Sequence, residues 1–330
     1  MALDVTVNIK LAEIVGKAGT WFPCLFVVNA ELAEDSYKEY SKLSELVTEY
    51  DENSEVYAAA SKLFAQNDAP NKIAVLAMTE FSSAKMEAYA TKGWRQLVLV
   101  GTHADVISIA QYVEGNRNLM LFGTVKTMDE LTELYKSVSQ YDRTFIVYHT
   151  TDAYAAAAVV GATAGLYAGS FTYKNVKIKG VQAMELSATE IEAIHKLGAI
   201  TIVEKVGDIV TSEGKVASGE YADNVDSKDY VVQNIAYKTQ KVFNNNNKVP
   251  YTNQGIAMLE TAVIEALKDA HNNGMIADNE DGTPAYSTDF ALRADTTETD
   301  RATRNYPYGK FQFAISGAIH NAIVNGTITV

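Results

Sequence analysis

The side chains best suited to chemistry are two histidines that follow strand-like segments. His103 and His149 each come shortly after a short apolar run. In an α/β sheet, ligands bind outside the carboxyl ends of the strands, so these histidines could serve an enzyme or a small-molecule binder. Polar loops also follow the strands of every such sheet, so a purely structural role stays open.

Other motifs give little support to a metal, nucleotide or hydrolase site. Residues 278–282 resemble part of a calcium loop, but their glycine comes one position early for an EF-hand and the closing glutamate is absent. The single cysteine, Cys24, lies in an apolar run, so we expect a buried apolar role rather than a disulfide or a metal site. The sequence has no P-loop, H-E-x-x-H or G-x-S-x-G motif. We therefore expect no catalytic, cofactor-binding or metal-binding residues and no cofactor.

Composition points to a globular protein with an acidic surface. The 330 residues are 47% hydrophobic and 21% charged, which suits two domains or one large domain with appendages. Lys and Arg number 28 against 41 Asp and Glu, and the net charge of −13 argues against broad nucleic-acid binding. The chain has neither a membrane-length apolar run nor a signal peptide at its start, so we expect no direct membrane contact and a cytosolic product.

The first half of the chain alternates between strand-like and helix-like patterns. Helical spacing at residues 43–50, with Ser41 as N-cap, and at residues 56–64 comes first. Short apolar runs then recur, separated by segments of helix length, at residues 73–78, 97–100, 119–122 and 145–148. Strands spaced by helices predict an α/β layer with a largely parallel sheet.

The second half mixes strands and helices. Residues 171–179 and 200–216 are β-like, and residues 219–227 are expected to form a polar, acidic connector. Two strong helical patterns follow, at residues 232–242 and 256–270. The fold class is therefore α/β, or α+β overall, with an α/β layered domain and a mixed C-terminal domain. We divide the chain into an N-terminal strand arm and joint (1–20), an α/β domain (21–170), a mixed α+β core domain (171–310) and a C-terminal strand arm (311–330).

The two chain ends have no partner nearby in the sequence. Residues 3–9 alternate strictly, with Val5, Val7 and Ile9 on the apolar face, and glycines 16 and 19 suggest a flexible joint behind them. At the other end, Asn325-Gly326 predicts a tight turn before a last short strand. These strands could pair with neighbouring subunits, or the first could pair with the last inside one subunit.

A mixed charge cluster lies in residues 290–304, which are expected to be polar and extended. Its members could form ion pairs within the chain or between subunits, or could belong to a solvated loop. The candidates for polar contacts between subunits are Arg293, Asp295, Glu298, Arg301 and Arg304.

Four stretches, in this order and spacing, resemble the tail sheath proteins of contractile phages and related injection particles. They are residues 40–66 followed by Ala69-Pro70 and a strand, residues 227–235 leading into a helix, residues 247–256, and residues 311–320 with the tail beyond. The likeness is to the compact branch, which lacks large surface insertions.

The resemblance implies a structural subunit that stacks helically around an inner tube. Subunits of this family lend terminal strands to their neighbours and rotate as nearly rigid bodies on contraction, without using a nucleotide. The implied partners are other copies of the chain, the inner tail tube protein, and the baseplate and tail terminator proteins. The implied location is the tail of a virion or a phage-tail-like particle, assembled in the bacterial cytoplasm. The implied inter-subunit strand links are Val5, Val7, Ile9, Thr327, Ile328 and Val330. A tube or baseplate component stays the alternative within this class.

Overall fold

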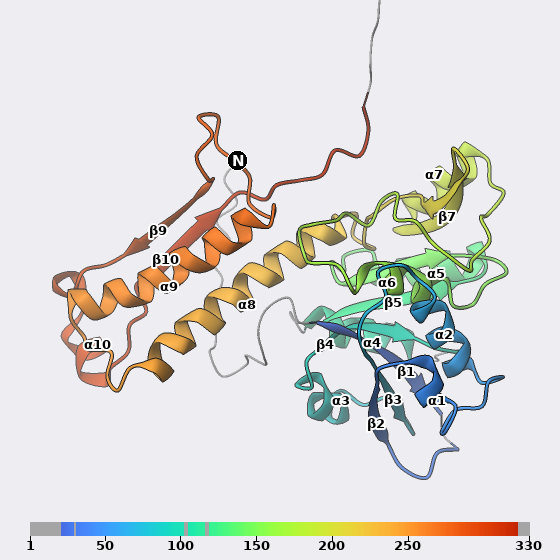
Figure 1. The fold of residues 1–330 in the computed structure, drawn as a ribbon, viewed down its shortest axis with the longest axis horizontal. Coiled ribbons are helices and arrows are strands. Elements are labelled where there is room, and N and C mark those ends of the chain that lie inside the picture. The colour runs from blue at the N-terminus through green and yellow to red at the C-terminus, as the bar shows by residue number, and fades with distance from the viewer. Residues whose placement is uncertain (1–20, 30, 102–104, 116–118, 323–330) are drawn as a thin grey trace, which may run out of the picture.

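The computed structural model describes residues 21–29, 31–101, 105–115 and 119–322, which form two lobes (Figure 1). The sheet lobe, the described residues up to 221, contains a large sheet with helices on both faces. The helical lobe, residues 222–316, contains two long helices and a two-stranded sheet. The first long helix, α8 (Ala222–Asn245), begins against the sheet lobe and runs out to form the spine of the helical lobe.

The sheet of the sheet lobe has eight strands in the order β2-β3-β1-β4-β5-β6-β7-β8. The six central strands are parallel, and β2 and β8 pair antiparallel at the two edges. A mostly parallel sheet is buried on both faces, and its strands are accordingly near-continuous apolar runs. Their bounds are β1 (Phe22–Val28), β2 (Ser36–Tyr40), β3 (Ile73–Met78), β4 (Trp94–Leu99), β5 (Met120–Val125), β6 (Thr144–Tyr148), β7 (Ala199–Lys205) and β8 (Asp208–Thr211).

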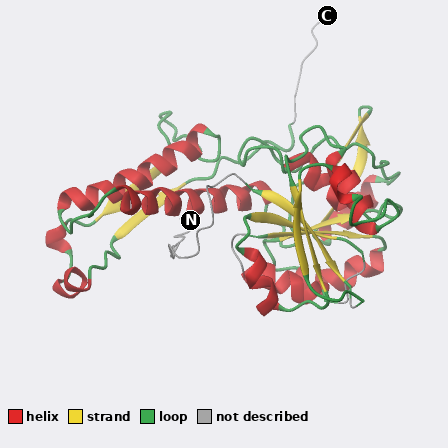
Figure 2. Ribbon diagram, turned by 60° about the horizontal axis from the view of Figure 1, so that its bottom comes forward, coloured by secondary structure: helices red, strands yellow, loops and turns green. Residues whose placement is uncertain are grey.

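Helices cover both faces of this sheet (Figure 2). One apolar core cluster lies between the sheet and α1 (Leu43–Leu46), α2 (Glu55–Phe64) and α6 (Ala155–Thr163). A second cluster lies on the other face, beneath α3 (Ser83–Ala90), α4 (Val106–Gly115), α5 (Met128–Val138) and α7 (Ala188–Lys196). The predicted α/β layer is confirmed in this three-layer arrangement.

Local signals in the sequence fix several helix starts. Ser54 caps α2 by accepting a hydrogen bond from the backbone N–H of Tyr57. Capping boxes, in which a side chain at the cap and a glutamate three residues later satisfy each other's backbone N–H groups, open α5 at Thr127 and α7 at Ser187. Such caps satisfy backbone donors that a helix cannot pair internally.

The helical lobe has a core of its own. Helix α9 (Asn253–Asn272) packs antiparallel to α8, and the strands β9 (Tyr286–Phe290) and β10 (Gly309–Phe313) lie alongside α9. Between the two strands, the chain forms a 3-10 helix, η2 (Arg293–Asp295), and the short helix α10 (Glu298–Thr303) at the end of the lobe farthest from the sheet lobe. The predicted mixed C-terminal region is confirmed.

Several local predictions need correction. Residues 219–227 are not a connector, because α8 already begins at Ala222 and buries residues there. Residues 171–179 form no strand, only an isolated bridge between Lys177 and Val210. The helix expected over residues 43–50 is a single turn, α1. Residues 290–304, expected to be extended, contain η2 and α10. The expected domain boundary at residue 170 falls within the region that builds the sheet, since β7 and β8 come after it.

The close contact between α6 and α2 depends on Gly161. A Cβ atom at this position would lie 2.3 Å from the backbone oxygen of Leu63, well inside van der Waals contact. We expect Gly161→Ala to lower the free energy of unfolding by about 1–3 kcal/mol, because the two helices must move apart. Urea denaturation measures this loss.

The matched control for this prediction is Gly115→Ala at the end of α4, where an added Cβ meets nothing within 4 Å. This variant is expected to leave stability unchanged or to raise it by up to about 1 kcal/mol. Equal losses in the two variants would contradict the packing role of Gly161.

Candidate assembly sites and the joint between the lobes

The small β9–β10 sheet offers strand edges to other chains. The two strands pair antiparallel, from Gly309 opposite Phe290 to Phe313 opposite Tyr286. Among the described residues no third strand joins this sheet, so both of its outer edges are unpaired there. An unpaired edge presents backbone N–H and C=O groups that can accept another strand.

Alternating side chains give this sheet a buried and an open face. Tyr286, Phe290, Phe311 and Phe313 pack on the core of the helical lobe beside α9. The intervening residues of both strands are exposed: Ser287, Asp289, Lys310 and Gln312. An isolated pair of strands is marginal in water, so this packing beside α9 is what keeps the open edges in place.

The charge cluster between β9 and β10 divides into inward and outward members. Arg301 is half-buried and donates hydrogen bonds from Nη1 to the Thr296 hydroxyl, 3.1 Å away, and to the Arg293 carbonyl, 3.3 Å away. It therefore holds the loop together. The other four predicted residues are exposed and form no ion pair within the described part of the chain: Arg293, Asp295, Glu298 and Arg304.

A buried group of charges joins α8 to the sheet. Arg95 of β4 is fully buried and donates to Asp226 Oδ1 at 2.6 Å and to Asp229 Oδ2 at 2.6 Å. Arg143, just before β6, makes a bidentate pair with Asp229, with both hydrogen bonds 2.7 Å long. The hydroxyl of Tyr173 completes the cluster by donating to Asp226 Oδ2 at 2.9 Å. We call these five residues the charge joint.

At the charge joint, burial and the arginine charges have opposite effects on the pKa values of the two aspartates. Burial alone would raise the pKa of the Asp229 carboxyl, but Arg95 and Arg143 outweigh it and hold that pKa below its usual range. Burial raises the pKa of Asp226 despite its contact with Arg95. Asp229, which both arginines share, is thus the anion on which the joint depends. Removing one partner from a buried ion pair is costly, because it leaves an uncompensated charge in the interior.

Trp21 also packs against the charge joint. Its ring lies over the Arg95 guanidinium at 4.4 Å, and its indole N–H donates to Gln233 of α8 at 2.8 Å. The ring also meets Tyr230 edge-on, with 6.5 Å between centroids. The first described residue of the chain is therefore fixed at the point where the two lobes meet.

The arrangement of His149 argues against a catalytic role. The side chain is buried, Nδ1 accepts the backbone N–H of Asp152 at 3.0 Å, and Nε2 lies 2.9 Å from the carbonyl of Gln182. Because Nδ1 accepts, Nε2 must carry the proton, so both nitrogens are used within the fold. His103, the other histidine in this hypothesis, lies outside the described residues.

A serine–histidine pair elsewhere is also structural. His195 Nε2 lies 2.9 Å from Ser212 Oγ, and this hydroxyl accepts the backbone N–H of Thr201 at 3.0 Å. Ser212 is buried, so no substrate can reach its oxygen, and the pair fixes α7 against β7. Burial lowers the pKa of His195.

The acidic loop at residues 278–284 is a self-contained turn. Asp281 Oδ1 accepts from both the backbone N–H of Thr283, at 3.0 Å, and its hydroxyl, at 2.6 Å. Within the described ranges, no cluster of three or more His, Cys, Asp or Glu side chains could hold a metal ion. None of the helices described is both long and apolar enough to cross a membrane.

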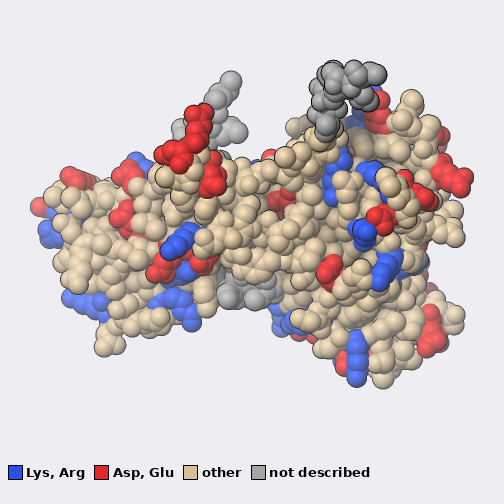
Figure 3. Space-filling view, turned by 45° about the horizontal axis from the view of Figure 1, so that its top comes forward, with Lys and Arg blue, Asp and Glu red and all other residues tan. Residues whose placement is uncertain are grey.

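Charge is mixed over the surface seen in Figure 3. Acidic and basic side chains on that face lie scattered among uncharged ones, without a continuous basic stripe. Nucleic-acid binding needs a positive surface along the phosphates, and this face does not supply one.

The strand links expected at the chain ends cannot be compared with the structure. Val5, Val7, Ile9, Thr327, Ile328 and Val330 all lie outside the described residues, and their role stays a prediction. The charge joint was not predicted from the sequence. A signal was present: Arg95 interrupts an apolar strand, and Asp223, Asp226 and Asp229 recur at a spacing of three, which places them along one side of a helix.

Comparison with known proteins gives a family model and a set of similar folds. Residues 222–329 match the model described as "E217 tail sheath protein gp31-like, C-terminal domain". No curated protein is a significant sequence match. Solved structures match over nearly the whole chain at low identity, so they establish the fold.

Several of these structures are sheath proteins. The sheath complex of the PVC extracellular contractile injection system, in the contracted state, has a TM-score of 0.74 at 14% identity, covering 99% of this chain and 97% of that one. The contracted helical sheath of the anti-feeding prophage has a TM-score of 0.69 at 13% identity, with 99% and 98% coverage. The sheath tail protein Lin1278 from Listeria innocua has a TM-score of 0.56 at 9% identity, with 92% and 97% coverage.

Proposed function

We propose that this chain, which has the sheath fold over nearly its whole length and matches a tail sheath domain at residues 222–329, is a structural subunit of a contractile tail sheath. The β9–β10 sheet is the structural feature that supports this proposal most directly. It is held on a core of two long helices and has both outer edges unpaired within the described residues.

This sheet and the pattern of the chain ends support strand exchange between subunits. Strands from neighbouring copies add to the edges of β9 and β10, so that the sheet is shared between subunits. The donors are the alternating strand with Val5, Val7 and Ile9 and the last strand with Thr327, Ile328 and Val330. Backbone hydrogen bonds give these links strength and alternate side chains set their register. Contacts that join unlike surfaces without closing a ring build helical tubes.

The charge joint supports contraction by movement of nearly rigid subunits. Arg95 and Arg143 on the sheet, with Asp226 and Asp229 on α8, tie the two lobes through buried hydrogen bonds of 2.6–3.1 Å. The subunit then moves as one body while the strand links hold. The energy of contraction is stored in the extended assembly, so the chain needs no cofactor and we assign it no catalytic activity.

The tip of the helical lobe provides polar contacts to neighbours. Arg293, Asp295, Glu298 and Arg304 are exposed there, and we propose that their charges pair across subunit boundaries. Arg301 acts within the subunit instead. The remaining proposed partners are the inner tail tube protein, the baseplate and the tail terminator protein, in a virion or a phage-tail-like particle assembled in the bacterial cytoplasm.

Negative-stain microscopy of the purified full chain tests this function. We expect tubes or stacked rings that become more abundant as protein concentration rises. A variant that lacks residues 1–10 should stay monomeric with an unchanged circular dichroism spectrum. Persistent folded monomers of the full chain at high concentration would count against a sheath subunit.

A further inference from the structure

The last described residues leave the helical lobe and return to the sheet lobe. After β10 the chain stays bound to the helical lobe for three residues: Ala314 donates to Ala285 at 2.9 Å, and Ser316 donates to Met275 at 2.9 Å. It then crosses to the sheet lobe as an extended segment without secondary structure (Figure 1). This crossing ends at His320.

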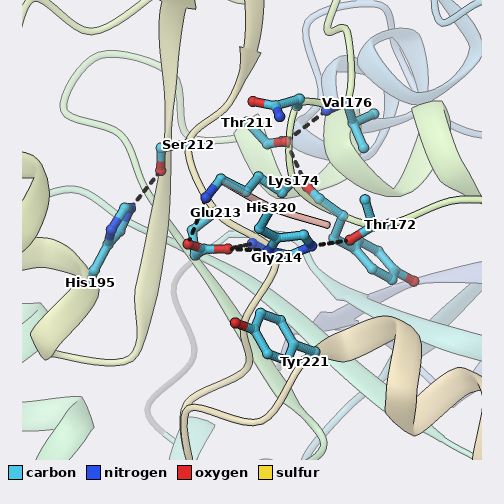
Figure 4. A network of polar contacts seen from close by, with 12 residues as sticks. Thr172, Lys174, Val176, His195, Thr211, Ser212, Glu213, Gly214, Tyr221 and His320 are labelled. Carbon is cyan, nitrogen blue, oxygen red and sulfur yellow. Dashed lines mark hydrogen bonds and ion pairs between the residues drawn. The ribbon is translucent and has the colours of Figure 1, made fainter. Parts of the chain in front are cut away.

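His320 is held on three sides in a polar recess of the sheet lobe (Figure 4). Its Nε2 lies 2.9 Å from the Thr172 hydroxyl, and its Nδ1 lies 3.1 Å from Glu213 Oε1. The ring meets Tyr221 edge-on, with 4.8 Å between centroids. Thr172 and the segment between β8 and α8, which supplies Glu213 and Tyr221, therefore converge on one imidazole.

Within this extended segment, His320 is the residue whose side chain inserts into the sheet lobe, while its neighbours are exposed. Its side chain is 8% exposed, whereas Ile319 is 89% exposed and Asn321 and Ala322 are exposed as well. An extended segment attached through a single side chain depends on the contacts of that side chain.

The recess is built independently of the segment that enters it. Glu213 receives hydrogen bonds from the N–H of Gly214 at 3.0 Å and from Lys174 at 3.2 Å. Burial alone would raise the pKa of Glu213, but these two bonds and the charge of Lys174 outweigh it and lower that pKa. Glu213 is thus a fixed carboxylate that accepts the Nδ1–H of His320. Tyr221 is fixed as the residue that precedes α8.

We propose that His320 anchors the C-terminal arm to the sheet lobe, so that residues 323–330 are offered to a neighbouring copy from this lobe rather than from β10. This role rests on the proposed function, in which those residues form a donated strand. The anchor shortens the part of the arm that is free to move. Fewer residues therefore lose conformational entropy when the end of the arm binds a neighbouring copy. His320 is therefore a positioning residue for strand donation.

A spin label on the arm tests the anchor in the free subunit. Cys24 is buried, and burial raises the pKa of its thiol, so a cysteine introduced as Ala322→Cys takes the label selectively. With His320 present, we expect restricted nitroxide motion. His320→Leu keeps the bulk but removes both hydrogen bonds, and should raise the mobility severalfold. His320→Gln, which can still donate to Glu213 and accept from Thr172, should restore the restriction.

His271→Leu is the matched control, because His271 bonds to Asp278 in the helical lobe. It should leave the label as restricted as in the parent protein. Equal mobility in the parent and in His320→Leu would overturn the anchor.

Tube formation tests whether the anchor serves assembly. At equal folded concentration, His320→Leu should lower the yield of tubes severalfold and His320→Gln should restore it. If His320→Leu raises the mobility of the label but leaves the tube yield unchanged, the positioning role is overturned. If the parent chain forms no tubes, the proposed function fails together with that role, while the label mobility still decides whether His320 is an anchor.

Discussion

Replacing Asp229 with asparagine is expected to lower the free energy of unfolding by about 3–5 kcal/mol, because breaking a buried ion pair leaves an uncompensated charge. Asp229 accepts from Arg95 at 2.6 Å and from both terminal nitrogens of Arg143 at 2.7 Å. In the variant, Arg143 still donates to the carbonyl of Leu119, but it no longer has the Asp229 carboxylate as its partner. Urea denaturation followed by circular dichroism measures the change.

An exposed aspartate provides the matched control for this variant. Asp208 pairs with Lys177 at 2.9 Å, and both side chains are more than half exposed. Asp208→Asn should change stability by less than about 1 kcal/mol, as is usual for surface pairs. A loss of that small size in Asp229→Asn would show that the joint does not hold α8 to the sheet.

Replacing Val5, Val7 and Ile9 together with serine is expected to abolish tube formation. These three residues lie, with Leu3, on the apolar face of the strand that we propose is donated to a neighbour. Serine keeps the backbone able to pair but removes the apolar contact that fixes register and burial. Sedimentation velocity and negative-stain microscopy, at concentrations where the parent chain forms tubes, measure the loss.

The opposite face of the same strand supplies the control. Replacing Asp4, Thr6 and Asn8 with serine alters the same number of residues and should leave tubes intact, since these side chains face solvent in the proposed pairing. Loss of tubes in both triple variants, or in neither, would contradict a donated strand with one apolar face.

The parts of the fold that the sequence predicted are those set by local patterns. The strand expected at residues 73–78 is β3 with the same bounds, because a short, wholly buried strand is a continuous apolar run. Helix α2 was predicted from its helical spacing, and the structure adds Ser54 as its N-cap. The mostly parallel sheet followed from the alternation of such runs with helices.

The parts that were missed depend on partners far away in the sequence. Residues 219–227 look like a polar connector until Asp226 is paired with Arg95, which comes 131 residues earlier. Strand β9 carries the alternation Tyr286, Thr288 and Phe290 but is only five residues long among polar neighbours. His320 looked like any tail residue, since its contact with Thr172 spans 148 residues.

The most direct measurement is cryo-electron microscopy of the tubes formed by the full chain. We expect the β9–β10 sheet to gain strands from neighbouring copies, with Val5, Val7 and Ile9 aligned along one of its edges. A β9–β10 sheet that stays two-stranded in the tube, with residues 3–9 paired to residues 327–330 of the same subunit, would contradict it.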